Sequence, residues 1–318
     1  MPEACDSMKK PDFSPQVHPP FALRLPKRQT LPVVVTSAHS GNRYPDAFLA
    51  AAAVDRTLLR RSEDWAMHRL AGPTPSFGAP LLSASFPRTF LDANREPFEL
   101  DPTMFRTELP DYVNRASRRV QAGLGTVHRY ATDGAEIYAA PLEFGEVLLR
   151  IEHCYLPFHA QLERLIRATV RRFGLCILLD CHSMPSLVAH EHGPSGRPID
   201  FVLGDLRGVS CDAGVTDRAH AILARRGWSG CRNDPYAGAF ITRHYGRPDR
   251  RVHALQLEIS RGLYMDEDQL TAAPGFAAVS NVLCELIAGL GTLGLAMTRP
   301  PRRQPLPPDT LDSPWQAG

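Results

Sequence analysis

The sequence carries almost no net charge. Its 318 residues include 36 Lys and Arg against 34 Asp and Glu, which gives a formal net charge of +2. The two signs are interspersed, so no extended field exists that would attract nucleic acid or an anionic membrane. An acidic ligand would have to be held by local groups, and a small molecule is therefore the expected partner.

Neither a disulfide framework nor a signal peptide is expected from the sequence. The seven cysteines are an odd number and include no C-x-x-C pair, which argues against a disulfide framework or a structural zinc knuckle. The stretch MPEACDSMKKPDF lacks the apolar core of a signal peptide. The most apolar segment, roughly 276–297, is interrupted by Asn281 and Glu285. We therefore expect a protein of the reducing cytoplasm.

Proline is abundant, but it is concentrated at the two ends. Seven of the 29 prolines fall in residues 1–32 and six in 299–318. Such segments propagate neither a helix nor a central strand. The expected organisation is a proline-rich tail at 1–30, a single catalytic domain at 31–297 and a second proline-rich tail at 298–318.

Short apolar runs alternate with helical patterns between the tails. This alternation predicts an α/β protein, with a sheet covered by helices. One helix is expected over FHAQLERLIRATVRRFG, with Pro157 before it and Gly174 as its stop. The expected strands are 31–38, 80–86, 175–180, 199–204 and 252–260.

Three of these strands lead into residues that can bind a metal or transfer a proton. His39 follows 31–38, His182 follows 175–180, and Glu258 lies near the end of 252–260. Ligands of open α/β sheets bind at the carboxyl ends of strands. A hydrolytic zinc site needs about three His or acidic ligands, an open position for water and a nearby carboxylate. The pattern favours two imidazole ligands and Glu258 as the carboxylate.

The spacing leaves the third ligand open. Asn42 stands where an H-x-x-E zinc motif would have its Glu, and a neutral amide is a poor zinc ligand. Asp64, in RRSEDWAMHRL, is the preferred substitute and Glu63 is its rival. An exposed pair of acids on a helix explains Glu63 and Asp64 as well as a ligand role does.

The stretch FPRTFLDANREPFELD (86–101) offers a carboxylate-binding pair. Asn94 and Arg95 combine a planar guanidinium with a directional amide. The alternative is a surface turn with a weak Asp92–Arg95 ion pair.

Several longer stretches resemble the N-formylglutamate amidohydrolase family. They are SAHSGNRYP, FPRTFLDANRE, YLPFHAQL, LLDCHSMPS, FVLGD, NDPYAGAFITRHYG and VHALQLEISRGLYMDE, in this order over roughly 35–267. More distantly, DANR, the strand ending in DCHS and the strand with Glu258 are similar to zinc carboxypeptidases, aspartoacylase and succinylglutamate desuccinylase. The resemblance implies a three-layer α/β/α fold around a mixed, mostly parallel sheet of eight strands.

The resemblance also implies ligands and catalytic roles. One zinc ion per chain would be bound by His39, Asp64 and His182, and Glu258 would act as general base and acid. Asp180 and Cys181 would finish their strand before His182 leaves it. Asp180 or a backbone carbonyl would accept the other N–H of His182, and Cys181 would point to the opposite side.

The implied reaction is hydrolysis of N-formyl-L-glutamate to formate and L-glutamate. Asn94 and Arg95 would hold the α-carboxylate, and Arg88, Arg243 or Arg261 the second one. The oxyanion would be stabilised by Arg88 or by the NDPYAG segment, which contains Asn233 and Tyr236. Two alternatives remain: a zinc hydrolase of another N-acyl amino acid or small peptide, and a non-catalytic metal- or ligand-binding homologue.

Overall fold

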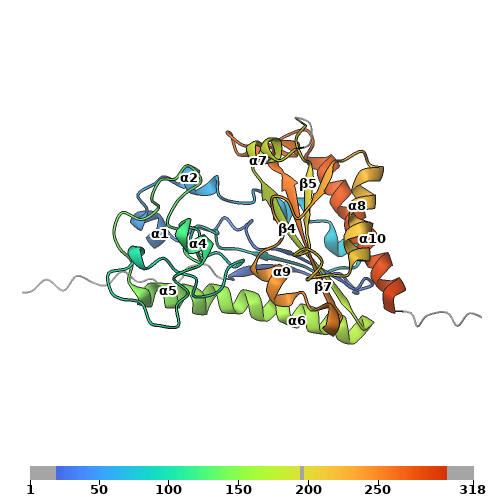
Figure 1. Cartoon of the computed structure of the whole chain (residues 1–318), viewed down its shortest axis with the longest axis horizontal. Helices are drawn as coiled ribbons and strands as arrows, with labels where there is room; N and C mark the ends of the chain where they lie inside the picture. Colours follow the sequence, from blue (N-terminus) through green and yellow to red (C-terminus); the bar gives the residue numbers. More distant parts are fainter. Residues whose placement is uncertain (1–18, 194–196, 299–318) are drawn as a thin grey trace, which may run out of the picture.

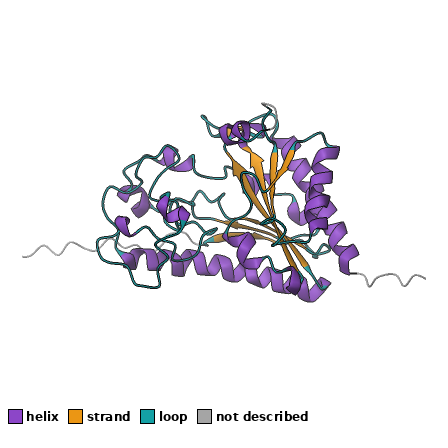
Figure 2. Cartoon of the chain, viewed as in Figure 1, coloured by secondary structure: helices purple, strands orange, loops and turns teal. Residues whose placement is uncertain are grey.

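One mixed sheet lies between two layers of helices (Figures 1 and 2). The computed structural model describes residues 19–193 and 197–298. Within them the main sheet has seven strands in the order β1-β3-β2-β4-β7-β5-β6. Its strands are β1 (Phe21–Arg24), β2 (Val33–Ser37), β3 (Leu81–Ala84), β4 (Cys176–Met184), β5 (Phe201–Gly204), β6 (Gly230–Arg232) and β7 (Val252–Ser260).

The sheet has one strand fewer than the resemblance implies. Among the described residues the two remaining strands, β8 (Met265–Asp266) and β9 (Thr271–Ala272), pair only with each other. The α-helices are α1 (Asp46–Ala51), α2 (Arg56–Arg60), α3 (Met67–Leu70), α4 (Arg118–Gln121), α5 (Phe144–Arg150), α6 (Leu156–Phe173), α7 (Ser186–Glu191), α8 (Ala213–Arg225), α9 (Phe240–Tyr245) and α10 (Phe276–Thr298). The 3₁₀ turns are Thr74–Phe77, Pro102–Met104, Pro248–Arg250 and Arg261–Leu263, and Ile151–Tyr155 is a π turn.

The strand directions make the sheet mixed and mostly parallel, as expected. β2, β3, β4 and β7 run the same way, whereas β1 is antiparallel to β3 and β5 is antiparallel to β7. β1 corrects one boundary: residues 21–24, which the proline content assigns to a tail, form an edge strand because their backbone pairs with β3. Residues 1–18 and 299–318 lie outside the described part of the chain.

Alternating strand residues divide the core in two. Leu178 of β4 packs with Phe158 and Leu162 of α6 on one face. Its neighbour Leu179 packs on the other face with the helices α3, α8 and α10. The fully buried strands therefore lie between helical layers, which is the α/β/α arrangement expected from the sequence.

The helix α10 is long and apolar enough to cross a membrane by length and composition alone. Its buried face, which includes Leu283, Ile287 and Leu290, packs on the sheet and on α8. Glu285 on the outer side receives a hydrogen bond from Arg226 Nε at 2.8 Å. These contacts are those of a core helix with one polar face.

The centre of the sheet brings the predicted reactive residues to one edge. β2, β4 and β7 are adjacent and parallel, so their carboxyl ends meet at the same place. His182 lies within β4 instead of leaving it, which corrects the expected end of this strand. The reason is β7, whose nine residues pair with β4 in register up to Met184, and His182 is paired with Glu258.

Candidate active site

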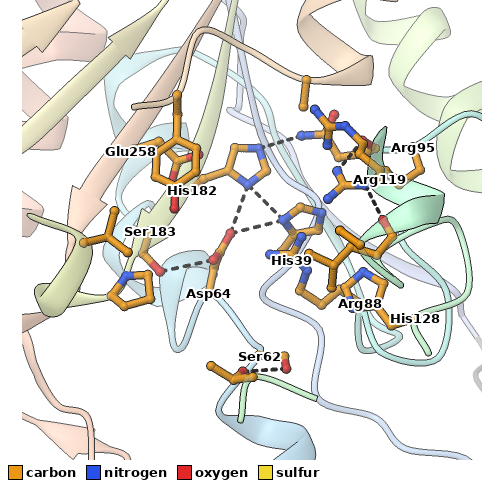
Figure 3. Close-up of a pocket in the computed structure, with 18 of the residues that line it drawn as sticks. His39, Ser62, Asp64, Arg88, Arg95, Arg119, His128, His182, Ser183 and Glu258 are labelled. Atoms are coloured by element: carbon orange, nitrogen blue, oxygen red, sulfur yellow. Dashed lines mark hydrogen bonds and ion pairs between the residues drawn. The ribbon is translucent and has the colours of Figure 1, made fainter. Parts of the chain in front are cut away.

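A cleft of about 790 Å³ opens at the carboxyl ends of these three strands (Figure 3). Nine of the ten predicted site residues line it. They are His39, Asp64, Arg88, Asn94, Arg95, His182, Tyr236, Glu258 and Arg261. The tenth, Asn233, is not among the lining residues.

The side chains of His39, Asp64 and His182 converge within the cleft (Figure 3). Asp64 Oδ2 lies 2.9 Å from His182 Nδ1 and 3.4 Å from His39 Nδ1, and the two Nδ1 atoms are 3.1 Å apart. A tetrahedral zinc ion bound at about 2.0–2.2 Å separates its ligand atoms by roughly 3.3–3.5 Å. The triangle is thus close to the size that such an ion requires.

The outer nitrogens of both imidazoles contact buried acids. His39 Nε2 lies 2.7 Å from Asp92 Oδ1, and His182 Nε2 lies 2.8 Å from Asp180 Oδ2. A carboxylate accepts, so each Nε2–H is the donor to its acid, and each Nδ1 faces inward, where a neutral ring could offer its lone pair to a metal. Metal-binding histidines are oriented in this way. The donor set therefore fits zinc, and of the two acceptors expected for His182, Asp180 or a backbone carbonyl, the structure has Asp180.

Asp64 is held in place by the loop that follows β2 and by β4. Its backbone N–H donates to His39 O at 3.0 Å, and Ser183 Oγ donates to its Oδ1 at 3.2 Å. Burial would raise the pKa of Asp64, but hydrogen bonds from His182 and His39 hold that pKa well below its usual range. The carboxylate is thus ionised and ready to act as a ligand.

The other two candidates for the third metal ligand, Glu63 and Asn42, lie away from the two histidines. Glu63 Oε1 accepts a hydrogen bond from Tyr44 OH at 2.7 Å and does not line the cleft. Asn42 is exposed and is also absent from the lining. Of the three candidates, the fold brings only Asp64 to the histidines.

Arg261 braces the Asp64 loop. Its guanidinium donates to Arg61 O at 2.9 Å and to Glu63 O at 2.8 Å, and its Nε donates to Ser183 Oγ at 3.2 Å. Each of the three nitrogens thus donates to the protein. The geometry favours a positioning role over the substrate-binding role that the sequence analysis expects.

Glu258 lies opposite His182 on the neighbouring strand, at the other side of the metal-ligand group from the arginines (Figure 3). Gln256 Nε2 donates to Glu258 Oε1 at 2.8 Å. Burial raises the pKa of Glu258 to about 7; Asp64 and Asp180 add to the rise, and His182 and Arg88 oppose it. A carboxylate with such a pKa can both accept and return a proton near neutral pH.

Cys181 takes no part in the cleft. Its side chain is fully buried in the core on the opposite face of the sheet from His182, as strand alternation predicts. Burial raises the pKa of its thiol well above the usual range. A Cys–His nucleophile pair is therefore excluded by the geometry.

The segment 86–101 is not a surface turn. Asp92 is fully buried and accepts hydrogen bonds from Arg88 Nη2 at 2.9 Å and from the backbone N–H of Asn94 at 2.8 Å. His128 Nε2 also lies 3.1 Å from its Oδ2. Burial would raise the pKa of Asp92, but Arg95, His39 and Arg88 hold it well below its usual range. This ionised acid is the centre of the wall beside His39.

A long helix supports this segment from below. α5, the π turn Ile151–Tyr155 and α6 run without interruption (Figure 1). A π turn closes i to i+5 hydrogen bonds, which brings residues five apart onto one face. The helix donates three hydrogen bonds to loop carbonyls: Arg150 Nη1 to Phe90 O at 3.2 Å, Tyr155 OH to Arg95 O at 2.8 Å and His159 Nε2 to Ala93 O at 2.9 Å.

Asn94 and Arg95 line the cleft but are largely engaged within the protein. Asn94 Oδ1 accepts from the backbone N–H of Ile241 at 2.7 Å, and its Nδ2 donates to Asp180 Oδ2 at 3.4 Å. Arg95 donates from Nε to Leu124 O and from Nη1 to Asn94 O, both at 2.9 Å. Its Nη2 is 3.7 Å from Asp92, too far for a hydrogen bond, so this nitrogen is available to a ligand.

The NDPYAG segment contributes one of its two predicted residues. Tyr236 lines the cleft, and burial raises the pKa of its phenol. Asn233 has a left-handed backbone with φ of 60°. Its Nδ2 donates to Asp205 Oδ1 at 2.8 Å, which holds the Asn233 side chain away from the cleft. Arg243 also lies outside the lining and pairs with Glu96 at 2.8 Å.

Gln256, His128 and Arg119 are among the cleft residues that were not predicted from the sequence. Gln256 lies two residues before Glu258 in β7, where strand alternation places both on the cleft face, so this signal was present in the sequence. His128 and Arg119 come from a long irregular connection with no strand end near them. No pattern in a single sequence points to that contribution.

The open cleft contains a buried acid with two imidazoles and a second carboxylate beside them. Metal-dependent hydrolases have such a set of side chains. Residues 31–265 match the N-formylglutamate amidohydrolase family profile. The chain belongs to the N-formylglutamate amidohydrolase family and is an enzyme that hydrolyses a carbon–nitrogen amide bond.

Its relatives agree with this assignment. The N-formylglutamate deformylase of Pseudomonas aeruginosa is 31% identical over 244 residues, 76% of this chain and 85% of that protein. That of Pseudomonas putida is 29% identical over 253 residues, 75% and 84% of the two chains. The crystal structure of N-formylglutamate amidohydrolase from Ralstonia eutropha is similar with a TM-score of 0.82 and 35% identity, covering 87% of this chain and 99% of that one.

Proposed function

We propose that this enzyme is a zinc-dependent amidohydrolase that cleaves N-formyl-L-glutamate to formate and L-glutamate. The main observation behind the proposal is that one cleft contains both the His39–Asp64–His182 group and the buried carboxylate of Glu258. The names of the relatives, which are N-formylglutamate deformylases, support the substrate.

In this proposal one zinc ion per chain is held by His39, Asp64 and His182. When bound, it would supply Lewis acidity, which activates a water molecule and polarises the formyl carbonyl. Asp92 and Asp180 keep the two imidazoles in the tautomer that presents Nδ1.

Glu258 accepts a proton from the attacking water and returns it to the leaving amine nitrogen. Gln256 donates to Glu258 Oε1 and so orients the carboxyl group for this exchange. Arg88 supplies positive charge for the oxyanion, since it lines the cleft and acts electrostatically on both Asp64 and Glu258.

The substrate's α-carboxylate is bound by Arg95 through its available Nη2. Asn94 then positions protein groups instead of binding the substrate, because its amide oxygen accepts from Ile241 N and its amide nitrogen donates to Asp180. Tyr236 closes the cleft from the NDPYAG segment and contributes a hydroxyl. Localisation in the cytoplasm belongs to the same proposal and is supported by the six described cysteines, all of which are free.

The test is formate release from N-formyl-L-glutamate by the purified protein, with metal content measured in the same preparation. Activity should disappear on chelation and return with zinc at about one ion per chain. Activity that survives complete metal removal would overturn the zinc mechanism.

The same assay, run with other acyl groups, tests the two alternatives. Faster turnover of N-acetyl- or N-succinyl-glutamate would assign another N-acyl amino acid. Zinc binding without turnover of any acyl substrate would favour a non-catalytic homologue. The intact group of His39, Asp64, His182 and Glu258 argues against that homologue.

A further inference from the structure

One wall of the cleft holds more positive than negative charge. Figure 3 shows Arg88, Arg95 and Arg119 together on one side of the metal-ligand group. Asp92 is the acid that faces them, at 2.9 Å from Arg88 and 3.7 Å from Arg95. Two of the three guanidinium groups therefore share one carboxylate on this wall, and Asp92 also accepts from His39.

Arg119 is the cation on this wall that has no counter-ion. It makes no ion pair and no side-chain hydrogen bond with any described residue, although it is half-buried and lines the cleft. Glu99, a further acid that acts on Arg95, does not line the cleft and receives hydrogen bonds from Ser117 Oγ and Glu96 N. A half-buried guanidinium without a partner favours an anionic ligand.

The fold holds Arg119 beside Arg95. Ser117 caps the short helix α4 by accepting from Val120 N at 3.1 Å, and the Val120 side chain is buried. Arg119 O accepts from Leu124 N at 2.7 Å, and Leu124 O accepts from Arg95 Nε at 2.9 Å. One loop thus fixes both the backbone of Arg119 and the guanidinium of Arg95.

The two guanidinium groups also affect each other. Burial lowers the pKa of Arg95 to about 10, Asp92 opposes this fall, and the charges of Arg119 and Arg88 add to it. An anion bound at this wall would relieve the repulsion between like charges. The protein thus carries a preorganised cationic wall next to the position of bond cleavage.

We propose that Arg119 binds the side-chain carboxylate of the substrate, beside the α-carboxylate on Arg95, and so makes the enzyme selective for N-acyl derivatives of dicarboxylic amino acids. This inference rests on the proposed function, because it places the amide at the metal-ligand group. It assigns the second carboxylate to a residue other than Arg88, Arg243 or Arg261.

The contacts of those three arginines support this choice. Arg88 is bonded to Asp92 next to the metal-ligand group, Arg243 is paired with Glu96 outside the cleft, and Arg261 donates to the loop around Asp64. Arg119 alone among the four has its guanidinium unoccupied within the described residues. A neutral side chain would leave it without a partner, which is how a polar site rejects an uncharged analogue.

The experiment compares Arg119→Gln with Arg119→Lys and with the control Arg118→Gln. Arg118 is the preceding residue of α4, and its side chain is exposed and absent from the cleft lining. The substrates are N-formyl-L-glutamate, N-formyl-L-glutamine and the α-amide of N-formyl-L-glutamate. Each is assayed with the zinc-loaded full chain, and kcat and KM are separated.

Arg119→Gln should lower kcat/KM for N-formyl-L-glutamate by about 10- to 100-fold, mainly through KM, as expected for losing a charge-assisted hydrogen bond. Turnover of N-formyl-L-glutamine should change little, so the preference for glutamate should collapse. Arg119→Lys should recover part of the preference for N-formyl-L-glutamate, and Arg118→Gln should retain the full preference. An unchanged preference in Arg119→Gln, or a collapse of discrimination against the α-amide instead, would overturn the assignment.

Calorimetric binding of L-glutamate and L-glutamine to the same proteins separates this inference from the proposed function. Loss of glutamate binding in Arg119→Gln alone supports the subsite even if the wild type releases no formate, a result that would overturn only the function. Equal glutamate binding by Arg119→Gln and the wild type would overturn the subsite, whatever the wild type hydrolyses.

Discussion

Asp92 Oδ1 lies 2.7 Å from His39 Nε2, although the two residues are 53 positions apart in the chain. Asp92 is fully buried and also serves Arg88, so one acid fixes a metal-facing imidazole and a cleft cation together. The orientation of the candidate metal site is thus coupled to the charge of the arginine-lined wall of the cleft.

Replacing Asp92 by Asn should weaken metal binding about 10- to 100-fold, because the acceptor that fixes His39 loses its charge. Competition with a chromophoric zinc chelator measures this directly. Asp111→Asn is the matched control, since Asp111 is exposed and pairs with Arg115 at 3.8 Å. Wild-type zinc affinity in Asp92→Asn would show that His39 is oriented without this bond.

Glu258→Gln should lower kcat by about 10²- to 10⁴-fold, because the amide cannot accept the proton of the attacking water. Zinc content should remain near one per chain, since Glu258 is not part of the ligand triangle. Rapid-mixing kinetics with metal analysis on the same sample measures both. Glu108→Gln, at an exposed acid, should behave as the wild type; equal turnover in Glu258→Gln would remove the residue from the mechanism.

Much of this arrangement could be predicted because it follows from strand periodicity. His182 and Glu258 lie in long apolar strands, and parallel neighbours bring their ends to one edge. The strands 252–260 and 175–180 were therefore sufficient to place them together. The predicted end of β4 was wrong because the length of this strand is set by its pairing with β7. Pairing between distant segments cannot be predicted from local sequence.

The cationic wall could not be predicted for a related reason. Arg119 and His128 reach the cleft through a connection whose course depends on contacts such as Leu124 O with Arg95 Nε. Conversely, Arg261 stands next to a strand end and looked like a substrate ligand, yet its nitrogens are satisfied by loop carbonyls. Residue type and position gave the location, and only the backbone partners revealed the role.

Gly41 lets the loop after His39 pass directly over another backbone segment. A Cβ at this position would lie 2.1 Å from Phe86 O, a distance that no side chain can adopt. Gly41→Ala should therefore cost about 1–3 kcal/mol of stability and also weaken zinc binding by shifting His39. Urea unfolding of the metal-free and zinc-bound proteins measures both effects.

Gly145→Ala is the matched control for Gly41, because a Cβ there meets nothing within 4 Å. Gly145 lies inside α5, where alanine is the better helix former by roughly 0.5–1 kcal/mol. The control should thus be as stable as the wild type or more so. Equal stability of both variants would mean that the loop yields to the added methyl group.

His159 should make the protein less stable in mild acid. Its Nε2–H donates to Ala93 O, and its Nδ1 accepts from Tyr245 OH at 2.9 Å, so the native ring is neutral. Burial lowers the pKa of His159 to about 4 from 6.5. Between these values the unfolded chain binds the proton and the native protein does not, so stability is complete above pH 6.5 and falls as the pH drops toward 4.

The size of the effect follows from the shift, at about 1.4 kcal/mol per pKa unit, or roughly 3 kcal/mol over the whole window. His159→Gln keeps a donor for Ala93 O and removes the titration. Between pH 7.5 and pH 4 the free energy of unfolding of this variant should therefore fall by roughly 3 kcal/mol less than that of the wild type. Urea unfolding across this range measures the difference. His190→Gln, at an exposed histidine, should follow the wild-type curve. Identical slopes for His159→Gln and the wild type would mean that the ring is already protonated in the native protein and that its contacts with Ala93 and Tyr245 rearrange.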